Sequence, residues 1–133
     1  MSHILIVEDE LQLRRIITMN LARHGYSVGE ADSVESALDM LLVAWEAGYP
    51  FDCIILEIHL AERSGWDLLR LLRSPEMARV GLPPMPVVVI SALPIPRSRV
   101  MEFSPMAALL KPFPIEALLR LVERANSAAP ATA

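Results

Sequence analysis

The chain has 133 residues, of which 53% are hydrophobic and 21% are charged, enough for one domain with a real core. Its formal net charge of −4 argues against a nucleic-acid surface, and no apolar block approaches the roughly 18 residues of a membrane helix. With a single cysteine, Cys53, and no signal peptide in view, we expect a cytoplasmic protein without disulfides.

The first half of the chain alternates short apolar runs, typical of buried strands, with segments of helical periodicity. In chain order we expect a strand over His3–Val7, a helix from about Leu13 to His24, a weaker strand over Ser27–Ala31, and a helix from Ser33 to about Trp45. Asp32 and Glu35 have the spacing of a capping box at the start of the second helix, and Ser33 is an equally good N-cap.

The second half continues the alternation, with a proline-rich interruption. We expect a strand over Phe51–Glu57, a helix over Gly65–Arg73, a loop over Ser74–Pro86, a strand over Val87–Ser91, a short helix over Arg97–Phe103, a strand over Ala107–Leu110, and a helix from Ile115 to about Ala125. Prolines motivate both the loop and the shortness of the fourth helix. The tail from Asn126 to Ala133 has no core-forming pattern and is expected to be frayed.

Strands and helices thus alternate five times, which predicts an α/β fold with right-handed crossovers. The apolar runs are continuous rather than alternating, so the sheet should be parallel and covered by helices on both faces. We expect a single domain over residues 1–126, followed by a disordered tail over residues 127–133.

Polar side chains follow the ends of four of these strands. In strand order they are Glu8, Asp9 and Glu10, then Glu57, Ser91 and Lys111. In a parallel sheet these ends share one edge, where ligands bind. Carboxylates gathered there need a cation, and oxygen ligands select Mg²⁺ or Ca²⁺. A hydroxyl and a lysine beside such a metal would cradle a phosphoryl group.

The chain resembles the receiver domain of two-component response regulators. Four segments carry the resemblance, which extends from about His3 to Asn126: Ile4–Glu10, Asp52–Gly65, Val87–Ser91 and Lys111-Pro112-Phe113. The family implies a flavodoxin-like (βα)5 three-layer sandwich around a five-stranded parallel sheet. It also implies an acidic pair that binds Mg²⁺, an aspartate phosphorylated by a histidine kinase, and a hydroxyl and a lysine that read the phosphoryl group.

The resemblance also implies which residues of this chain form the site. They are Glu8 and Asp9 as the acidic pair, Glu57 at the phosphoacceptor position, Ser91 as the hydroxyl, Lys111 as the lysine, and the backbone carbonyl of His59 as a further metal ligand beside Glu57. In the family the bond between the lysine and the following proline is cis, which here is Lys111-Pro112.

Three positions depart from the family pattern. Glu57 replaces the aspartate, and its extra methylene moves the carboxylate outward, where a misplacement of about 1 Å can cost about a hundredfold in rate. Ala61 replaces the usual proline, and Ala108 replaces the usual aromatic residue that couples to the hydroxyl. We therefore expect both the acceptor and the readout to be impaired, and Mg²⁺ binding to be weak or lost.

Three functions remain open. The first is an atypical receiver, a protein-interaction module in which Glu57 fixes one signalling state, either by mimicking a phosphorylated aspartate or by locking the inactive form. The second is a receiver that still takes a phosphoryl group from a histidine kinase, at Glu57 or Asp9. The third, a small Mg²⁺-dependent phosphatase, is disfavoured because the chain has no Gly-rich phosphate loop and no second nucleophile, so we expect no enzyme.

We expect the partners to be signalling proteins: a histidine kinase, an output protein, or a second copy of the chain. The family implies a dimer or output interface over the fourth helix, fifth strand and fifth helix. The candidate interface residues there are Met101, Phe103, Met106 and Ala108. For each residue taken singly, packing over the last strand is the favoured alternative. Neither nucleic acid nor membrane is an expected partner.

Overall fold

A computed structural model describes residues 2–127 and confirms the α/β alternation. Its elements in chain order are β1 (His3–Val7), α1 (Leu11–Arg23), β2 (Ser27–Ala31), α2 (Val34–Glu46), β3 (Cys53–Glu57), α3 (Gly65–Leu72), α4 (Pro75–Val80), β4 (Val87–Ser91), α5 (Arg97–Phe103), β5 (Ala107–Leu110) and α6 (Ile115–Ser127). In the described part of the chain, no helix combines the length and the apolar character needed to cross a membrane.

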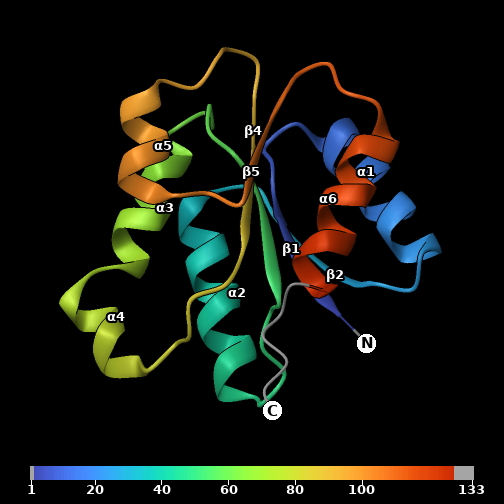
Figure 1. The fold of residues 1–133 in the computed structure, drawn as a ribbon. Helices are drawn as coiled ribbons and strands as arrows, with labels where there is room; N and C mark the ends of the chain where they lie inside the picture. The colour runs from blue at the N-terminus through green and yellow to red at the C-terminus, as the bar shows by residue number, and fades with distance from the viewer. Residues whose placement is uncertain (1, 128–133) are drawn as a thin grey trace.

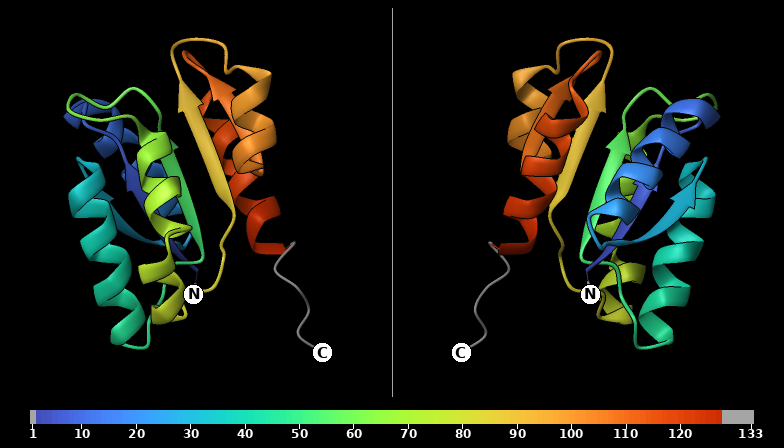
Figure 2. Two further views of the ribbon diagram at one scale, coloured as in Figure 1. Left: turned by 90° about the vertical axis from the view of Figure 1, so that its left-hand side faces the viewer. Right: turned by 90° about the vertical axis from the view of Figure 1, so that its right-hand side faces the viewer.

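The five strands form one sheet in the order β2-β1-β3-β4-β5, and every pairing is parallel. This is the flavodoxin-like strand order, so the predicted fold is confirmed. In the centre of the sheet Leu5 pairs with Ile54, and Leu56 pairs with Val89. Figure 2 shows the arrowheads of the strands, which mark their carboxyl ends, at a common edge of the sheet.

Helices cover both faces of the sheet, and each face has its own apolar core (Figure 1). On one face α2, α3 and α5 pack against side chains such as Leu5, Ile54 and Leu56. On the other face α1 and α6 pack against Ile6 and Ile55. Neighbouring residues of β1 and β3 therefore point into opposite cores, which explains why both strands are apolar without interruption.

The segment that prolines predicted to be a loop contains a helix, so that prediction is wrong for α4. The Ser74 hydroxyl caps it by accepting a hydrogen bond from the Met77 amide at 3.3 Å. Pro75 occupies the first turn, where a missing N–H costs nothing, and Gly81 ends the helix with φ of 80°. The fourth and fifth helices expected from sequence are therefore α5 and α6.

Three smaller boundaries also differ. The third strand begins at Cys53 rather than Phe51. The capping box at the start of α2 is formed by Ser33 and Ser36 and not by Asp32 and Glu35, so Ser33 is the N-cap. The last helix runs to Ser127, past the expected start of the tail, and the remainder of that tail, residues 128–133, lies outside the described residues.

A chain of surface ion pairs joins the helices on the face that carries α2, α3 and α5. Its charges alternate in sign along Glu35, Arg63, Asp67, Arg70, Glu102 and Arg99. The shortest link is 2.7 Å, between Arg63 and Glu35, and the longest is 3.9 Å, between Arg70 and Glu102. This series of ion pairs connects α2, the loop after β3, α3 and α5.

Candidate functional site

The carboxyl edge of the sheet buries three polar side chains. Glu8 is 1% exposed, Glu57 is 3% exposed and Ser91 is 1% exposed. Lys111 directly follows the edge strand β5, and its amide donates a hydrogen bond to the Ser91 carbonyl at 2.7 Å. Four strands thus bring these residues together at the edge that the sequence predicted.

The ammonium of Lys111 lies between the two buried carboxylates. Its Nζ atom is 3.0 Å from Glu8 Oε1 and also pairs with Glu57 Oε1. The second oxygen of each carboxylate accepts a backbone amide, Glu10 N–H at 3.1 Å for Glu8 and His59 N–H at 2.9 Å for Glu57. All four carboxylate oxygens therefore have a hydrogen-bond donor within the protein.

Burial and ion pairing shift the pKa values of these groups in opposite directions. Burial raises the pKa of Glu8, because a charged carboxylate loses its water, although the hydrogen bond from Lys111 opposes the rise. Burial would lower the pKa of Lys111, but its hydrogen bonds to Glu57 and Glu8 outweigh burial and raise it. Lys111 is therefore a permanent cation near neutral pH, and it supplies the positive charge of the pocket.

Ser91 is placed at the site, but its hydroxyl bonds to its own loop. Its Oγ donates to the Leu93 carbonyl at 2.6 Å and accepts from the Leu93 amide at 3.1 Å. The hydroxyl thus closes a local turn. Ala108, at the usual aromatic position, lies exposed on β5 and lines a cavity of about 210 Å³ together with Ser91.

The predicted metal ligands converge only in part. Glu8 and Glu57 share Lys111, whereas Asp9 is exposed. Within residues 2–127 no group of three or more His, Cys, Asp or Glu side chains could hold a metal ion. A divalent cation directly between the Glu8 and Glu57 carboxylates would meet the Lys111 ammonium, which pairs with both of them in this structure.

The loop after β3 is held against Glu57 by backbone contacts. The Gly65 amide donates to the Ile58 carbonyl at 2.8 Å, and the Ser64 hydroxyl caps α3 by accepting from the Trp66 amide at 3.1 Å. A Cβ atom on Gly65 would collide with the Glu57 carbonyl oxygen and lie 3.1 Å from Ile58 Cα. Only glycine allows α3 to begin this close to the site residue.

The predicted interaction face is only partly a surface. Met101 is 72% exposed and Ala108 is exposed, while Met106 is half-buried. Phe103 is 5% exposed and stacks on Trp66 with 5.0 Å between ring centroids, so it belongs to the core, the alternative favoured for each residue taken singly, and not to an exposed patch. Leu110, at 51% exposed, is a further apolar surface residue of β5, the strand that the sequence placed in this face.

Backbone groups of the site also escaped prediction. The amides of Glu10 and His59 hold the two buried carboxylates, and no residue type signals a main-chain donor. The cis peptide bond predicted between Lys111 and Pro112 is present.

Comparisons with known proteins agree on one family. The sequence model of the response regulator receiver domain matches residues 4–123. The probable transcriptional regulatory protein SilR of Salmonella typhimurium and the transcriptional regulatory protein CusR of Escherichia coli K12 are each 32% identical over 121 residues, or 90% of this chain and 48% of either relative. The chain thus spans about half the length of these regulators.

Solved structures confirm the fold. The non-phosphorylated HemR receiver domain from Leptospira biflexa superimposes with a TM-score of 0.77 at 23% identity, covering 96% of this chain and 95% of that domain. The chemotaxis protein CheY4 of Vibrio cholerae also gives 0.77, at 24% identity over 94% of this chain and 98% of CheY4.

Proposed function

The chain belongs to the response regulator receiver domain family, and from that membership we propose that it is an atypical receiver. In this proposal it is a protein-interaction module of two-component signalling whose pocket at the carboxyl edge carries a fixed charge. Glu57 and Lys111 hold one signalling state permanently, in place of a state that phosphorylation switches.

The observation that carries the proposal is the double ion pair of Lys111 with Glu8 and Glu57. An acceptor carboxylate must present an oxygen in line with an incoming phosphoryl group. Glu57 has one oxygen on Lys111 and the other on the His59 amide, so donors of the protein hold both oxygens in place. Its 3% exposure leaves little room for the approach.

The state of Ser91 supports the same proposal. A phosphoryl group on the neighbouring strand would be bound by a free hydroxyl. The Ser91 hydroxyl instead donates a hydrogen bond to the Leu93 carbonyl and accepts one from the Leu93 amide. With Ala108 at the usual aromatic position, no ring is available on β5 to follow a movement of that hydroxyl.

The proposed work of the chain is binding to other signalling proteins rather than catalysis. The relatives named above are transcriptional regulators about twice as long as this chain, so an output protein or a histidine kinase is the partner class that we propose. A second copy is a further candidate partner, through the face formed by α5, β5 and α6, where Met101 and Leu110 are exposed.

Phosphotransfer to the intact protein is the direct test. The protein is incubated with acetyl phosphate and Mg²⁺, and its intact mass is recorded at successive times. We expect no phosphoryl adduct, and the same incubation of a receiver with an aspartate acceptor serves as the positive control. An adduct on Glu57 or Asp9, located by peptide mapping, would establish the phosphorylatable alternative, and turnover of a phosphate ester would establish an enzyme.

A pair of substitutions tests whether Glu57 fixes the state. Glu57→Gln removes the charge and the ion pair while keeping the length of the side chain, and Glu57→Asp shortens it to the family's acceptor. We expect Glu57→Gln to alter the amide NMR shifts of β4, β5 and α5 and to change partner binding. If both variants leave these shifts and partner binding as in the unmodified protein, Glu57 does not set the state.

A further inference from the structure

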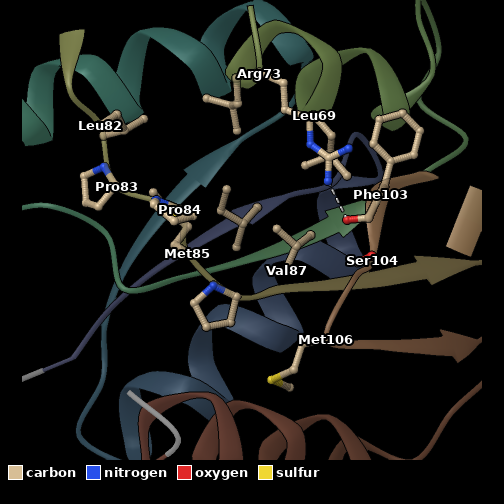
Figure 3. A pocket seen from close by; sticks show the side chains of 13 residues that line it. Leu69, Arg73, Leu82, Pro83, Pro84, Met85, Val87, Phe103, Ser104 and Met106 are labelled. Carbon is tan, nitrogen blue, oxygen red and sulfur yellow. Dashed lines mark hydrogen bonds between the residues drawn. The ribbon is translucent and has the colours of Figure 1, made fainter. Parts of the chain in front are cut away.

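A separate cavity of about 490 Å³ opens at the amino edge of the sheet (Figure 3), and Lys111 is not among the residues that line it. Ile54 and Val87, which lie near the starts of β3 and β4, form its floor. Figure 3 shows the side chains of the loop before β4 on one side of the cavity, with Arg73 and Phe103 on the other. Its volume falls within the range of about 300–1,000 Å³ typical of small-molecule sites.

The walls of the cavity are mainly apolar. The side chains that form them come from α3, the proline-rich loop and the segment before β5, and include Leu69, Leu72, Leu82, Pro84, Met85 and Met106. Leu69 is buried, while Leu72, Leu82 and Met85 are half-buried, so the cavity offers hydrocarbon surface to a ligand that enters from solvent. Such a wall favours an unbranched or aromatic apolar group over a sugar or a nucleotide.

One charge lies at the rim of this apolar wall. Arg73 is the only charged residue that lines the cavity, and in the part of the chain that the structure describes no carboxylate forms an ion pair with it. Its guanidinium donates to the carbonyls of Glu102 at 2.6 Å and Phe103 at 2.8 Å. It also lies 5.1 Å from the centroid of the Phe103 ring, which holds it in place.

The guanidinium keeps hydrogen-bonding capacity for a ligand. It has five N–H donors, and the two bonds to α5 use one N–H from each terminal nitrogen. The remaining donors match the oxygens of a carboxylate, which arginine binds in a fork geometry. Ser104, which also lines the cavity, adds a hydroxyl next to this position.

From this combination we propose that the cavity binds a small amphipathic carboxylate, an acyl acid of medium chain length. The carboxylate pairs with Arg73, and the hydrocarbon chain lies against Leu72, Leu82 and Met106. A phosphate or other strongly hydrated anion is disfavoured because the lining supplies one cation and a wall of hydrocarbon. The proposal does not depend on the charge or the phosphorylation of Glu57.

Sodium decanoate is the probe, and 1-decanol is its matched uncharged control. Titration of the intact protein, followed by amide NMR, should shift resonances of the 82–86 loop, of α3 and of the end of α5. Affinity should rise about fourfold for each added methylene from hexanoate to decanoate, as expected for burial of the chain. Shifts confined to exposed arginines elsewhere, or equal affinity for decanol and decanoate, would overturn the proposal.

Two variants test how much the charge of Arg73 contributes to decanoate binding, apart from the apolar wall of the cavity. Arg73→Gln should weaken decanoate binding about fivefold, as an exposed ion pair implies, and should leave decanol binding unchanged. Arg79→Gln on α4, which makes the same change in net charge outside the cavity, is the control and should leave decanoate binding as it is.

Arg73 also binds the end of α5, so Arg73→Gln could weaken binding by loosening that helix. A further variant that leaves Arg73 in place is therefore needed. Leu82→Trp, in a loop, should block the cavity and weaken both decanoate and decanol binding while the far-UV circular dichroism and Tm stay unchanged. Undiminished decanoate binding by a folded Leu82→Trp protein would place the ligand elsewhere and end the proposal.

Discussion

Lys111 places one positive charge between two buried carboxylates, and each of these three groups depends on the other two. Glu8 and Glu57 would repel each other and lack water if the ammonium were absent, since both are almost fully buried. A buried pair adds little stability over an apolar replacement of all partners, but removing one partner alone is costly. The pocket is therefore most vulnerable at its single cation.

Replacing Lys111 by methionine tests this dependence. We expect Lys111→Met to lower the free energy of unfolding by about 3 kcal/mol at pH 7, because two carboxylates are left without their cation. The loss should shrink at pH 4, where the carboxyl of Glu8, whose pKa is raised by burial, takes up a proton. Urea unfolding followed by tryptophan fluorescence measures both values.

The control for this substitution is Arg124→Met, on an exposed position of α6, which should cost little at either pH. An equal loss for Lys111→Met at pH 4 and pH 7 would show that lost packing, and not unpaired charge, causes the destabilisation.

Cys53 makes the free energy of unfolding depend on pH in the alkaline range. Burial, with a smaller contribution from the charge of Asp52, raises the pKa of its thiol from 9.0 to about 12. Because the folded pKa lies above the unfolded pKa, this contribution to stability is complete below pH 9 and is lost as pH rises toward 12. Cys53→Ala should flatten the fall of unfolding free energy between pH 9 and 11 by about 1.4 kcal/mol per pH unit.

Urea unfolding at half-unit steps of pH gives the slope of the unfolding free energy against pH for the unmodified protein and for Cys53→Ala. Taking the difference between the two slopes removes the contributions of lysine and tyrosine, which both proteins share. Parallel slopes would mean that the thiol ionises as easily in the folded chain as in the unfolded chain. The same burial explains why we expect Cys53 to be an inert core thiol.

At the scale of elements, periodicity was enough to place four of the strands, because each is a compact apolar run between polar turns, whereas the polar β2 was only a weaker candidate. It failed at α4, where prolines suggested a loop. The signals for this short helix were present in Ser74-Pro75 at its start and Gly81 at its end, but these three residues are a weaker signal than the number of prolines in the segment. Phe103 was misplaced for a related reason, since a seven-residue helix has too few turns to show which face is buried.

The start of α3 depends on the contact between Gly65 and β3. We expect Gly65→Ala to cost about 2 kcal/mol, because its Cβ would push against the Glu57 carbonyl, a backbone atom that cannot swing away. Gly81→Ala is a useful contrast: it meets no atom within 4 Å, and its cost comes only from φ of +80°.

Chemical denaturation of both variants, with NMR shifts of the Glu57 and His59 amides, separates the two mechanisms. Gly65→Ala should move these amides and Gly81→Ala should not. Unmoved Glu57 and His59 amides in a destabilised Gly65→Ala protein would contradict the proposed contact.

Helix α5 offers a matched pair of apolar residues. Phe103→Ala should lower the free energy of unfolding by about 3 kcal/mol, because Phe103 fills the space between Trp66 and the guanidinium groups of Arg70 and Arg73. Met101→Ala, on an exposed side chain of the same helix, should change it by less than about 0.5 kcal/mol. Trp66 fluorescence should respond to the first substitution alone, and equal costs would contradict the assignment of Phe103 to the core.

At the scale of the whole molecule, the parallel sheet assigns different chemistry to its two edges. The carboxyl edge gathers Glu8, Glu57, Ser91 and Lys111, and sequence reasoning found all four because strand ends in such a sheet must meet. The amino edge gathers Arg73 with the proline-rich loop, and no motif pointed to it. A cavity formed by loops and helix ends has no period, so it emerges only when the elements have been packed.

The ion pairs across α2, α3 and α5 should make the molecule mildly sensitive to salt. Asp67 pairs with both Arg63 and Arg70, at the centre of the series. Asp67→Asn should lower Tm in dilute buffer, and the difference from the unmodified protein should fall by about half or more in 1 M NaCl, where the Debye length is about 3 Å. A difference that does not change with salt would assign the effect of Asp67 to helix capping instead.

The alternation of sign along that same series has a consequence for how partners arrive. Three acidic and three basic side chains cancel, so this series contributes almost nothing to the electric field of a protein whose net charge is −4. A charged partner would feel its attraction or repulsion from charges outside this series, and the six paired side chains would not guide its diffusion. For a partner that contacts only this series, the association rate should depend little on ionic strength, and shape should decide the binding.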